Sequence, residues 1–147
     1  MKPQVIRFLA LILVGLWVWL PYGVAASTQI QWHSFSDGMA RGKFENKKVF
    51  LHFYADWCVF CAEMAQKAFK DPAVIASLNE NFIPIRVDVD QDMETASMFR
   101  IKGLPETLFI AENGDIISRR PGYISPDQLK EMLSVIIAQG AEQSQNP

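Results

Sequence analysis

The sequence predicts an α/β domain built on a mixed β-sheet with helices on both faces. Hydrophobic runs of strand length alternate with helix-like segments over residues 49–100. An Asn-Gly pair then separates two further strand-like runs, which indicates a hairpin. An amphipathic helix closes the domain. We therefore expect a βαβ unit followed by a ββα unit.

The βαβ unit begins with a hydrophobic and aromatic run over residues 49–55, which lies between polar residues and is typical of a buried central strand. Residues 62–70 favour a helix. Asp71 and Pro72 combine a helix N-cap with proline at the first helical position, so a second helical segment is expected to residue 79. The alternating residues 82–89 predict the next strand, which would pair in parallel with the first.

The second half is expected to start with a helix over residues 92–100. The runs 107–111 and 116–119 flank the Asn-Gly turn, and they would add antiparallel strands to the sheet. Ser125 and Pro126 then open the last helix. Its apolar face consists of Leu129, Met132, Leu133, Ile136 and Ile137.

The chain is predicted to contain three parts, of which residues 1–26 have the layout of a secretory signal. Lys2 and Arg7 precede an uncharged apolar run, which is shorter than the roughly 20 residues that a membrane-spanning helix needs, and small residues follow it. We expect cleavage near Ser27 and export; an uncleaved membrane anchor is the alternative, because two tryptophans in the run suit a membrane interface. Residues 27–138 would form one domain, and residues 139–147 a flexible tail.

Composition limits the partners that the domain can have. The 147-residue chain has 14 Lys and Arg against 16 Asp and Glu, and loss of the first 26 residues removes two of the basic ones. An acidic product argues against nucleic acid as a partner. One compact domain with half of its residues hydrophobic can form its own core, so a monomer is expected.

Cys58 and Cys61 are the only cysteines of the chain, and they lie where the predicted central strand gives way to a helix. A disulfide closing so short a loop adds little stability, which indicates that the pair is kept for redox chemistry. A sulfur at a helix start lies near unpaired N–H groups that stabilise its thiolate. Cys58 is therefore the expected nucleophile, and Cys61 would resolve the mixed disulfide that Cys58 forms.

Metal binding is the alternative use of a Cys-x-x-Cys pair. A tetrahedral zinc site needs further Cys or His ligands, and only His33 and His52 are available. We expect neither a metal nor another bound cofactor.

The segment from Phe53 to Cys61, Phe-Tyr-Ala-Asp-Trp-Cys-Val-Phe-Cys, resembles the active-site strand and loop of the thioredoxin superfamily. The similarity is greatest to the C-terminal thioredoxin-like domain of DsbD, a membrane thiol reductase, and it covers nearly the whole mature chain. Gly103-Leu104-Pro105-Glu106-Thr107 resembles the proline loop of the same superfamily. The resemblance implies a thioredoxin fold, protein disulfides as clients, and a membrane thiol transporter as electron donor.

The resemblance also implies a client-binding surface beside the cysteines. Trp57, Val59 and Phe60 would belong to it, and Pro105 would be cis. Because proline has no N–H, the Leu104 backbone would be free to pair with an extended client. The alternatives are simple packing for Trp57 and an ordinary strand-entry proline at position 105.

His52 departs from the family pattern, because thioredoxins carry a buried acid six residues before the first cysteine. An imidazole titrates near neutral pH, so His52 is a candidate proton relay that would accept the proton of Cys61. The alternative is a strand histidine whose ring is satisfied by a backbone carbonyl.

Together these features predict an enzyme outside the cytoplasm, in a bacterial periplasm, that exchanges disulfides with other proteins and acts as a reductase. Two alternatives stay open. The first is a periplasmic peptide-binding or assembly module with little redox activity. The second is an oxidase that donates disulfides to other proteins. Reduction potentials in this superfamily run from about −270 to about −120 mV, and Val-Phe between the cysteines is compatible with either direction.

Overall fold

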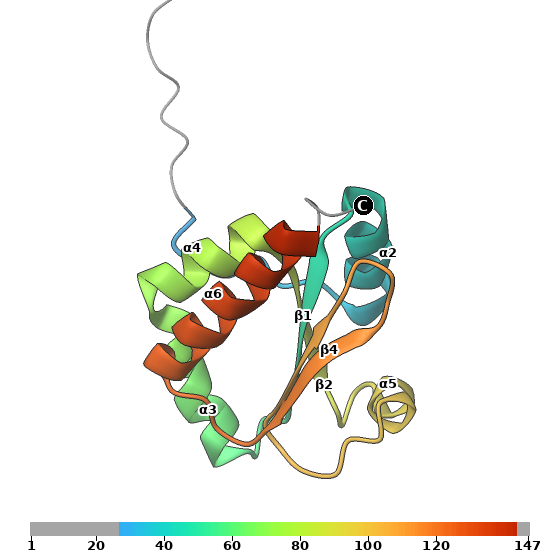
Figure 1. The fold of residues 1–147 in the computed structure, drawn as a ribbon. Helices are drawn as coiled ribbons and strands as arrows, with labels where there is room; N and C mark the ends of the chain where they lie inside the picture. Colours follow the sequence, from blue (N-terminus) through green and yellow to red (C-terminus); the bar gives the residue numbers. More distant parts are fainter. Residues whose placement is uncertain (1–26, 144–147) are drawn as a thin grey trace, which may run out of the picture.

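The computed structural model describes residues 27–143, with side chains through residue 140 (Figure 1). The predicted signal segment, residues 1–26, lies outside the described residues. Within residues 27–143, no helix combines the length and the apolar character needed to cross a membrane.

A mixed four-stranded sheet forms the centre of the domain, as predicted. The strands lie in the order β2-β1-β3-β4, with β1 parallel to β2, β3 antiparallel to β1, and β4 antiparallel to β3. Strand β1 is therefore central, and β4 is an edge strand. Their bounds are Lys48–Tyr54 for β1, Phe82–Asp88 for β2, Glu106–Ile110 for β3 and Ile116–Pro121 for β4.

Helices cover both faces of this sheet, again as predicted (Figure 1). One face carries α3 (Val59–Gln66), the 3-10 helix η2 (Ala68–Lys70), α4 (Pro72–Asn81) and α6 (Pro126–Gln143). The other face carries α2 (Phe35–Glu45) and α5 (Met93–Met98).

Strand β1 is apolar along its length because it contributes to a core on each face of the sheet. Phe50 packs in the core under α4 and α6, whereas Leu51 and Phe53 pack in the core under α2 and α5. All three side chains are fully buried. Burying one such side chain contributes about 1.5–3 kcal/mol, so this strand holds the carboxyl end from which the active-site loop starts in a fixed place.

Helix α2 was not predicted, and two glycines explain why its sequence is a weak helix signal. A Cβ atom at Gly38 would lie 2.3 Å from the Ile85 side chain, and one at Gly42 would lie 2.8 Å from the Val49 side chain. The glycines therefore let the helix approach the sheet closely. This requirement comes from tertiary packing and cannot be read from the helix sequence alone.

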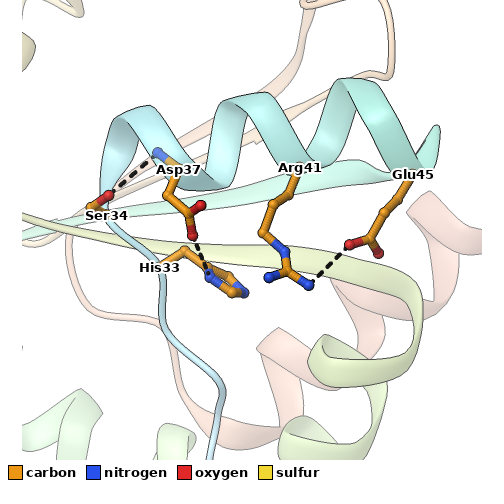
Figure 2. A network of polar contacts seen from close by, with 5 residues as sticks. All are labelled: His33, Ser34, Asp37, Arg41 and Glu45. Carbon is orange, nitrogen blue, oxygen red and sulfur yellow. Dashed lines mark hydrogen bonds and ion pairs between the residues drawn. The ribbon is translucent and has the colours of Figure 1, made fainter.

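Polar contacts at the start and on the exposed side of α2 support it locally (Figure 2). The Ser34 hydroxyl accepts a hydrogen bond from the Asp37 backbone N–H at 3.3 Å, as an N-cap residue does. The Asp37 carboxylate also lies 3.1 Å from Nδ1 of His33, and Arg41 bonds to Glu45 one turn later.

Several boundaries differ from the predicted ones. The helix expected over residues 62–70 starts at Val59 and breaks into α3 and η2. Helix α5 ends at Met98, and Arg100 then adopts a left-handed conformation with φ of 54°. Helix α6 runs to Gln143, so residues 139–143 of the predicted tail are helical. Residues 144–147 lie outside the described part of the chain.

Candidate active site

The two cysteines form a disulfide at the point where the central strand leads into α3. Strand β1 ends at Tyr54, and Cys58 is the N-cap residue of α3, with extended backbone dihedral angles. The Cys58 sulfur accepts a hydrogen bond from the Cys61 N–H at 3.2 Å. The two cysteines are three residues apart, about one turn of α3. Because Cys58 is the N-cap, the first backbone N–H groups of α3 point toward it.

This geometry distinguishes the two sulfurs chemically. When the disulfide is reduced, the positive end of the α3 dipole and the Cys61 N–H would both stabilise a thiolate on Cys58. Cys58 is also the more exposed residue, at 6% against 2% for Cys61. The arrangement therefore suits Cys58 as the nucleophile and Cys61 as the inner thiol.

The proline loop lies against the disulfide. Leu104 packs on the small cluster that Ala55 forms with the two cysteines, so a residue far along the chain contacts the redox pair. The peptide bond between Leu104 and Pro105 is cis, which is the geometry that the resemblance implies. Pro105 is buried, and its carbonyl oxygen accepts a hydrogen bond from the Gly122 N–H at 2.7 Å.

An exposed apolar rim, Trp57, Val59 and Phe60, borders the disulfide on the solvent side. Their exposed fractions are 69%, 77% and 58%. Simple core packing is therefore not the role of Trp57. Its indole N–H donates a 2.8 Å hydrogen bond to the Asp90 carboxylate, which lies in the loop after β2. Asp90 is anchored in turn, because its backbone N–H bonds to the Asp88 side chain at 3.0 Å.

His52 lies in β1 and is buried in the core between the sheet and the helices, at 1% exposed. Its Nδ1 is 3.1 Å from the Thr107 hydroxyl, and its ring packs edge-on against Phe69. Nε2 is buried without a hydrogen-bond partner among the described residues. Burial, and then the positive charge of Arg86, lower the pKa of His52 to about 3, so the imidazole is neutral at physiological pH.

Arg86 and Thr107 flank His52 on the neighbouring strands, so the three residues form a row across β2, β1 and β3. The Arg86 guanidinium lies 3.7 Å from the centre of the Tyr54 ring, as a cation–π contact. Where the alternative to a proton relay gave His52 a backbone carbonyl as partner, the structure has the Thr107 hydroxyl. Neither cysteine belongs to the contacts that His52 makes in the described structure.

The structure also identifies site residues that the sequence did not point to. Asp90 holds Trp57, and Glu106, directly after Pro105, is buried in an ion pair with Arg119. The sequence offers one indication of Asp90: it follows a predicted strand, and the carboxyl ends of strands are where α/β sheets place their sites. The sequence offers no indication of Arg119, because its contacts with Glu106 and Phe99 join segments that are apart in sequence.

Among the residues that the structure describes, no three His, Cys, Asp or Glu side chains form a group that could hold a metal ion.

Comparisons with known proteins give a consistent result. The thioredoxin-like domain family model matches residues 35–136. A thioredoxin of Mycoplasmoides gallisepticum is 34% identical over 88 residues, which cover 60% of this chain and 83% of that protein. The thiol:disulfide interchange protein DsbD of Vibrio vulnificus is 39% identical over 84 residues, which cover 54% of this chain and 14% of DsbD. The similarity to DsbD thus concerns a small part of that larger protein.

Solved structures show the same fold. A thioredoxin from Thermus thermophilus superposes with a TM-score of 0.69 at 22% identity, covering 76% of this chain and 90% of that one. The C-terminal domain of Neisseria meningitidis DsbD in the oxidised form superposes with a TM-score of 0.59 at 22% identity, covering 68% and 90%. The predicted thioredoxin fold and the predicted likeness to the DsbD C-terminal domain are confirmed.

Proposed function

Because the chain belongs to the thioredoxin-like domain family and carries the Cys58–Cys61 disulfide, it is a protein-disulfide oxidoreductase, and we propose that it works outside the cytoplasm as a reductase of client proteins. The observation that carries this proposal is the position of Cys58 at the N-terminus of α3, between the exposed apolar rim and the proline loop.

The proposed reaction has two displacement steps. The Cys58 thiolate attacks one sulfur of the client disulfide, which forms a mixed disulfide and releases the other client sulfur as a thiolate. The Cys61 thiol then loses its proton and attacks the Cys58 sulfur. This step forms the Cys58–Cys61 disulfide and releases the second client thiolate. Two electrons pass from the dithiol to the client, and the two client thiolates take up protons from water.

We propose that clients bind on the apolar rim and on the proline loop. The rim offers three large exposed side chains next to the disulfide, and exposed apolar groups in a contiguous patch are typical of protein-binding surfaces. Leu104 contacts the cysteine cluster from the other side. A client held between these two elements would present its disulfide to Cys58, with the Leu104 backbone pairing with an extended client segment.

The reductase direction requires an electron supply. After each turnover the protein is left oxidised, and a second dithiol protein must reduce it. The similarity to part of DsbD supports a membrane thiol protein as that donor, which is an argument from family analogy. We propose that the protein works as a monomer, since one compact domain with half of its residues hydrophobic can form its own core.

The extracytoplasmic location is supported by the sequence of residues 1–26, with its basic start, apolar run and small residues before Ser27. N-terminal sequencing of the protein recovered from the periplasm of an expressing bacterium tests it. The expected first residue lies near Ser27. Recovery of the protein only from the cytoplasm would contradict export.

The proton relay through His52 stays a prediction. It requires that the imidazole take a proton near neutral pH, whereas its pKa in the oxidised protein is about 3. The low pKa supports the alternative role, a neutral ring bonded to Thr107. Replacing His52 with Ala and finding unchanged resolution rates between about pH 6 and 8 would rule out the relay.

The proposed function is tested by reduction of insulin disulfides with dithiothreitol as electron source, together with trapping by the Cys61→Ala variant. We expect catalysis by the wild type and a stable mixed disulfide at Cys58 in the variant. If the wild type exchanges no disulfides, the protein is not a reductase, and a binding role for the apolar rim would be tested next.

A further inference from the structure

The proline loop belongs to a segment without regular structure that joins α5 to β3. Helix α5 ends at Met98, and β3 begins at Glu106. Leu104 and Pro105, which lie beside the cysteines, are near the end of this segment. Since no helix or strand ladder contains the residues between its ends, the position of the proline loop depends on individual hydrogen bonds and side-chain contacts.

Arg119 on the edge strand β4 contacts both ends of this segment. One guanidinium nitrogen, Nη1, donates a hydrogen bond to the Glu106 carboxylate at the start of β3. The other, Nη2, donates a 2.8 Å hydrogen bond to the backbone carbonyl of Phe99, directly after α5. The planar guanidinium has several donors in a fixed fork and can satisfy both acceptors at once, which a lysine ammonium on a flexible stem does not reproduce.

Burial makes this contact more than a surface ion pair. The Glu106 side chain is 7% exposed and that of Arg119 is 38% exposed. A buried carboxylate that loses its partner still carries the cost of desolvation. The Glu106 charge therefore strongly favours the conformation in which Arg119 pairs with it. The end of β4 adds a second tie, because the Gly122 N–H bonds to the Pro105 carbonyl.

We propose that Arg119 is a positioning residue for disulfide exchange, which holds the Phe99-to-Glu106 segment closed so that the Leu104–Pro105 element faces the cysteine pair. Arg119 contacts neither cysteine in the described structure, so it acts through the loop. This inference rests on the proposed exchange with protein clients. It adds that the client-docking element is held in place from the edge strand of the sheet.

The adjacent Arg120 provides a matched control. It lies on the same strand and carries the same charge, it is exposed, and it makes no ion pair within the described residues. Arg119→Ala and Arg120→Ala therefore remove the same side chain and the same charge, and only the first removes the contacts to the loop.

The test measures kcat and KM for insulin reduction by the full-length protein, and the rate with 5,5′-dithiobis(2-nitrobenzoate), a small disulfide that needs no docked polypeptide. Misplacing a binding element by about 1 Å can cost about a hundredfold, so we expect Arg119→Ala to lower kcat/KM for insulin about tenfold or more, mainly through KM. The rate with the small disulfide should fall much less. Arg120→Ala should stay within about twofold of wild type in both assays.

Arg119→Lys separates a loss of positioning from a folding defect. It keeps a positive charge near Glu106 but cannot donate to Glu106 and to the Phe99 carbonyl at the same time as the guanidinium does. Amide hydrogen exchange over residues 100–104 should be faster in Arg119→Lys than in wild type, with the thermal unfolding midpoint little changed. Equal kcat/KM for insulin in Arg119→Ala and Arg120→Ala would overturn the inference. So would unchanged hydrogen exchange in Arg119→Lys. A wild type that reduces no insulin would overturn the proposed function itself, and with it this inference.

Discussion

The solvent side and the core side of the Cys58–Cys61 disulfide invert the usual partition of side chains. In front of it, Trp57, Val59 and Phe60 are large, apolar and exposed. In the core, His52 and Thr107 are polar and almost completely buried. Apolar side chains normally fill the interior and imidazoles normally reach water. Departures from this rule are expected where function constrains the sequence. Here the apolar departure borders the redox pair, whereas the polar one lies within β1 and β3, away from the cysteine cluster.

The comparison separates what each side contributes. The exposed rim makes few contacts within the chain, so its residues can be changed with little effect on folding, and their effect should be on client binding. His52 and Thr107 are packed and bonded to each other, so these residues should affect stability and its pH dependence. Four sets of substitutions, at the disulfide, His52, Trp57 and Asp90, test this division in order of decreasing expected effect.

The largest effect is expected at the disulfide that separates the two sides. Cys58→Ser replaces the thiolate nucleophile with a hydroxyl, so exchange with client disulfides should fall by about a thousandfold or more. Cys61→Ser keeps the nucleophile and should accumulate a mixed disulfide with the client. Mass spectrometry of the client adducts distinguishes the variants, and an adduct on Cys61 in Cys58→Ser at the wild-type rate would reverse the assigned roles.

The buried side is tested by the pH dependence of stability. The pKa of His52 is about 3 in the folded protein, against 6.5 for an unperturbed histidine. Between these values the unfolded state binds a proton that the folded state does not, so stability is complete above pH 6.5 and is lost as the pH falls toward 3. The slope is at most about 1.4 kcal/mol per pH unit.

His52→Gln isolates this contribution, because Gln has no titrating group and can still bond to Thr107. From about pH 6 to pH 4, the free energy of unfolding of the oxidised wild type should fall about 2 kcal/mol more than that of the variant. Urea unfolding at several pH values measures the difference. Parallel curves for the two proteins would show that His52 binds a proton as readily in the folded state as in the unfolded state, which would contradict the lowered pKa.

The exposed side is tested by Trp57→Ala. Loss of one large side chain from a binding surface should raise KM for a protein client about tenfold, because aromatic residues dominate such surfaces. The free energy of unfolding should change little, since Trp57 is 69% exposed. Val135→Ala on α6, at 48% exposed, is a control outside the site. If Trp57→Ala and Val135→Ala had equal KM values for the client, the apolar rim would not be part of the client-binding surface.

The smallest effect is expected at Asp90, which orients the Trp57 indole. Asp90→Asn keeps an oxygen acceptor and removes the charge, whereas Asp90→Ala removes both. Because the hydrogen bond orients the indole, KM for the client should rise about two- to fivefold in Asp90→Ala. In Asp90→Asn it should stay near the wild-type value. Equal effects in the two variants would assign the role to charge.

The sequence was sufficient for features that local patterns encode. The alternation of Phe82 to Val89, the Asn-Gly turn and the cysteine pair at a strand-to-helix junction predicted the mixed sheet and the redox site. Each of these depends on residues close together in the chain. The start of α3 at Val59 was placed three residues late, because the cysteine that precedes it is an unusual N-cap residue.

Other features depend on contacts between segments far apart in sequence. Gly38 and Gly42 weaken the helical signal of α2, and their purpose is visible only when the helix lies on the sheet. The contacts of Arg119 with Glu106 and Phe99 likewise cross from β4 to the ends of the proline loop segment. The alternative to a proton relay gave His52 a backbone carbonyl as partner, and the strand register instead places Thr107 opposite it.

The most direct test of the proposed reductase is the equilibrium reduction potential of the Cys58–Cys61 pair, measured against glutathione in the full-length protein. A dithiol that reduces client disulfides needs a potential near that of thioredoxin, and we predict a value near about −270 mV. A value near about −120 mV, typical of strong disulfide donors, would contradict the reductase direction and identify the protein as an oxidase.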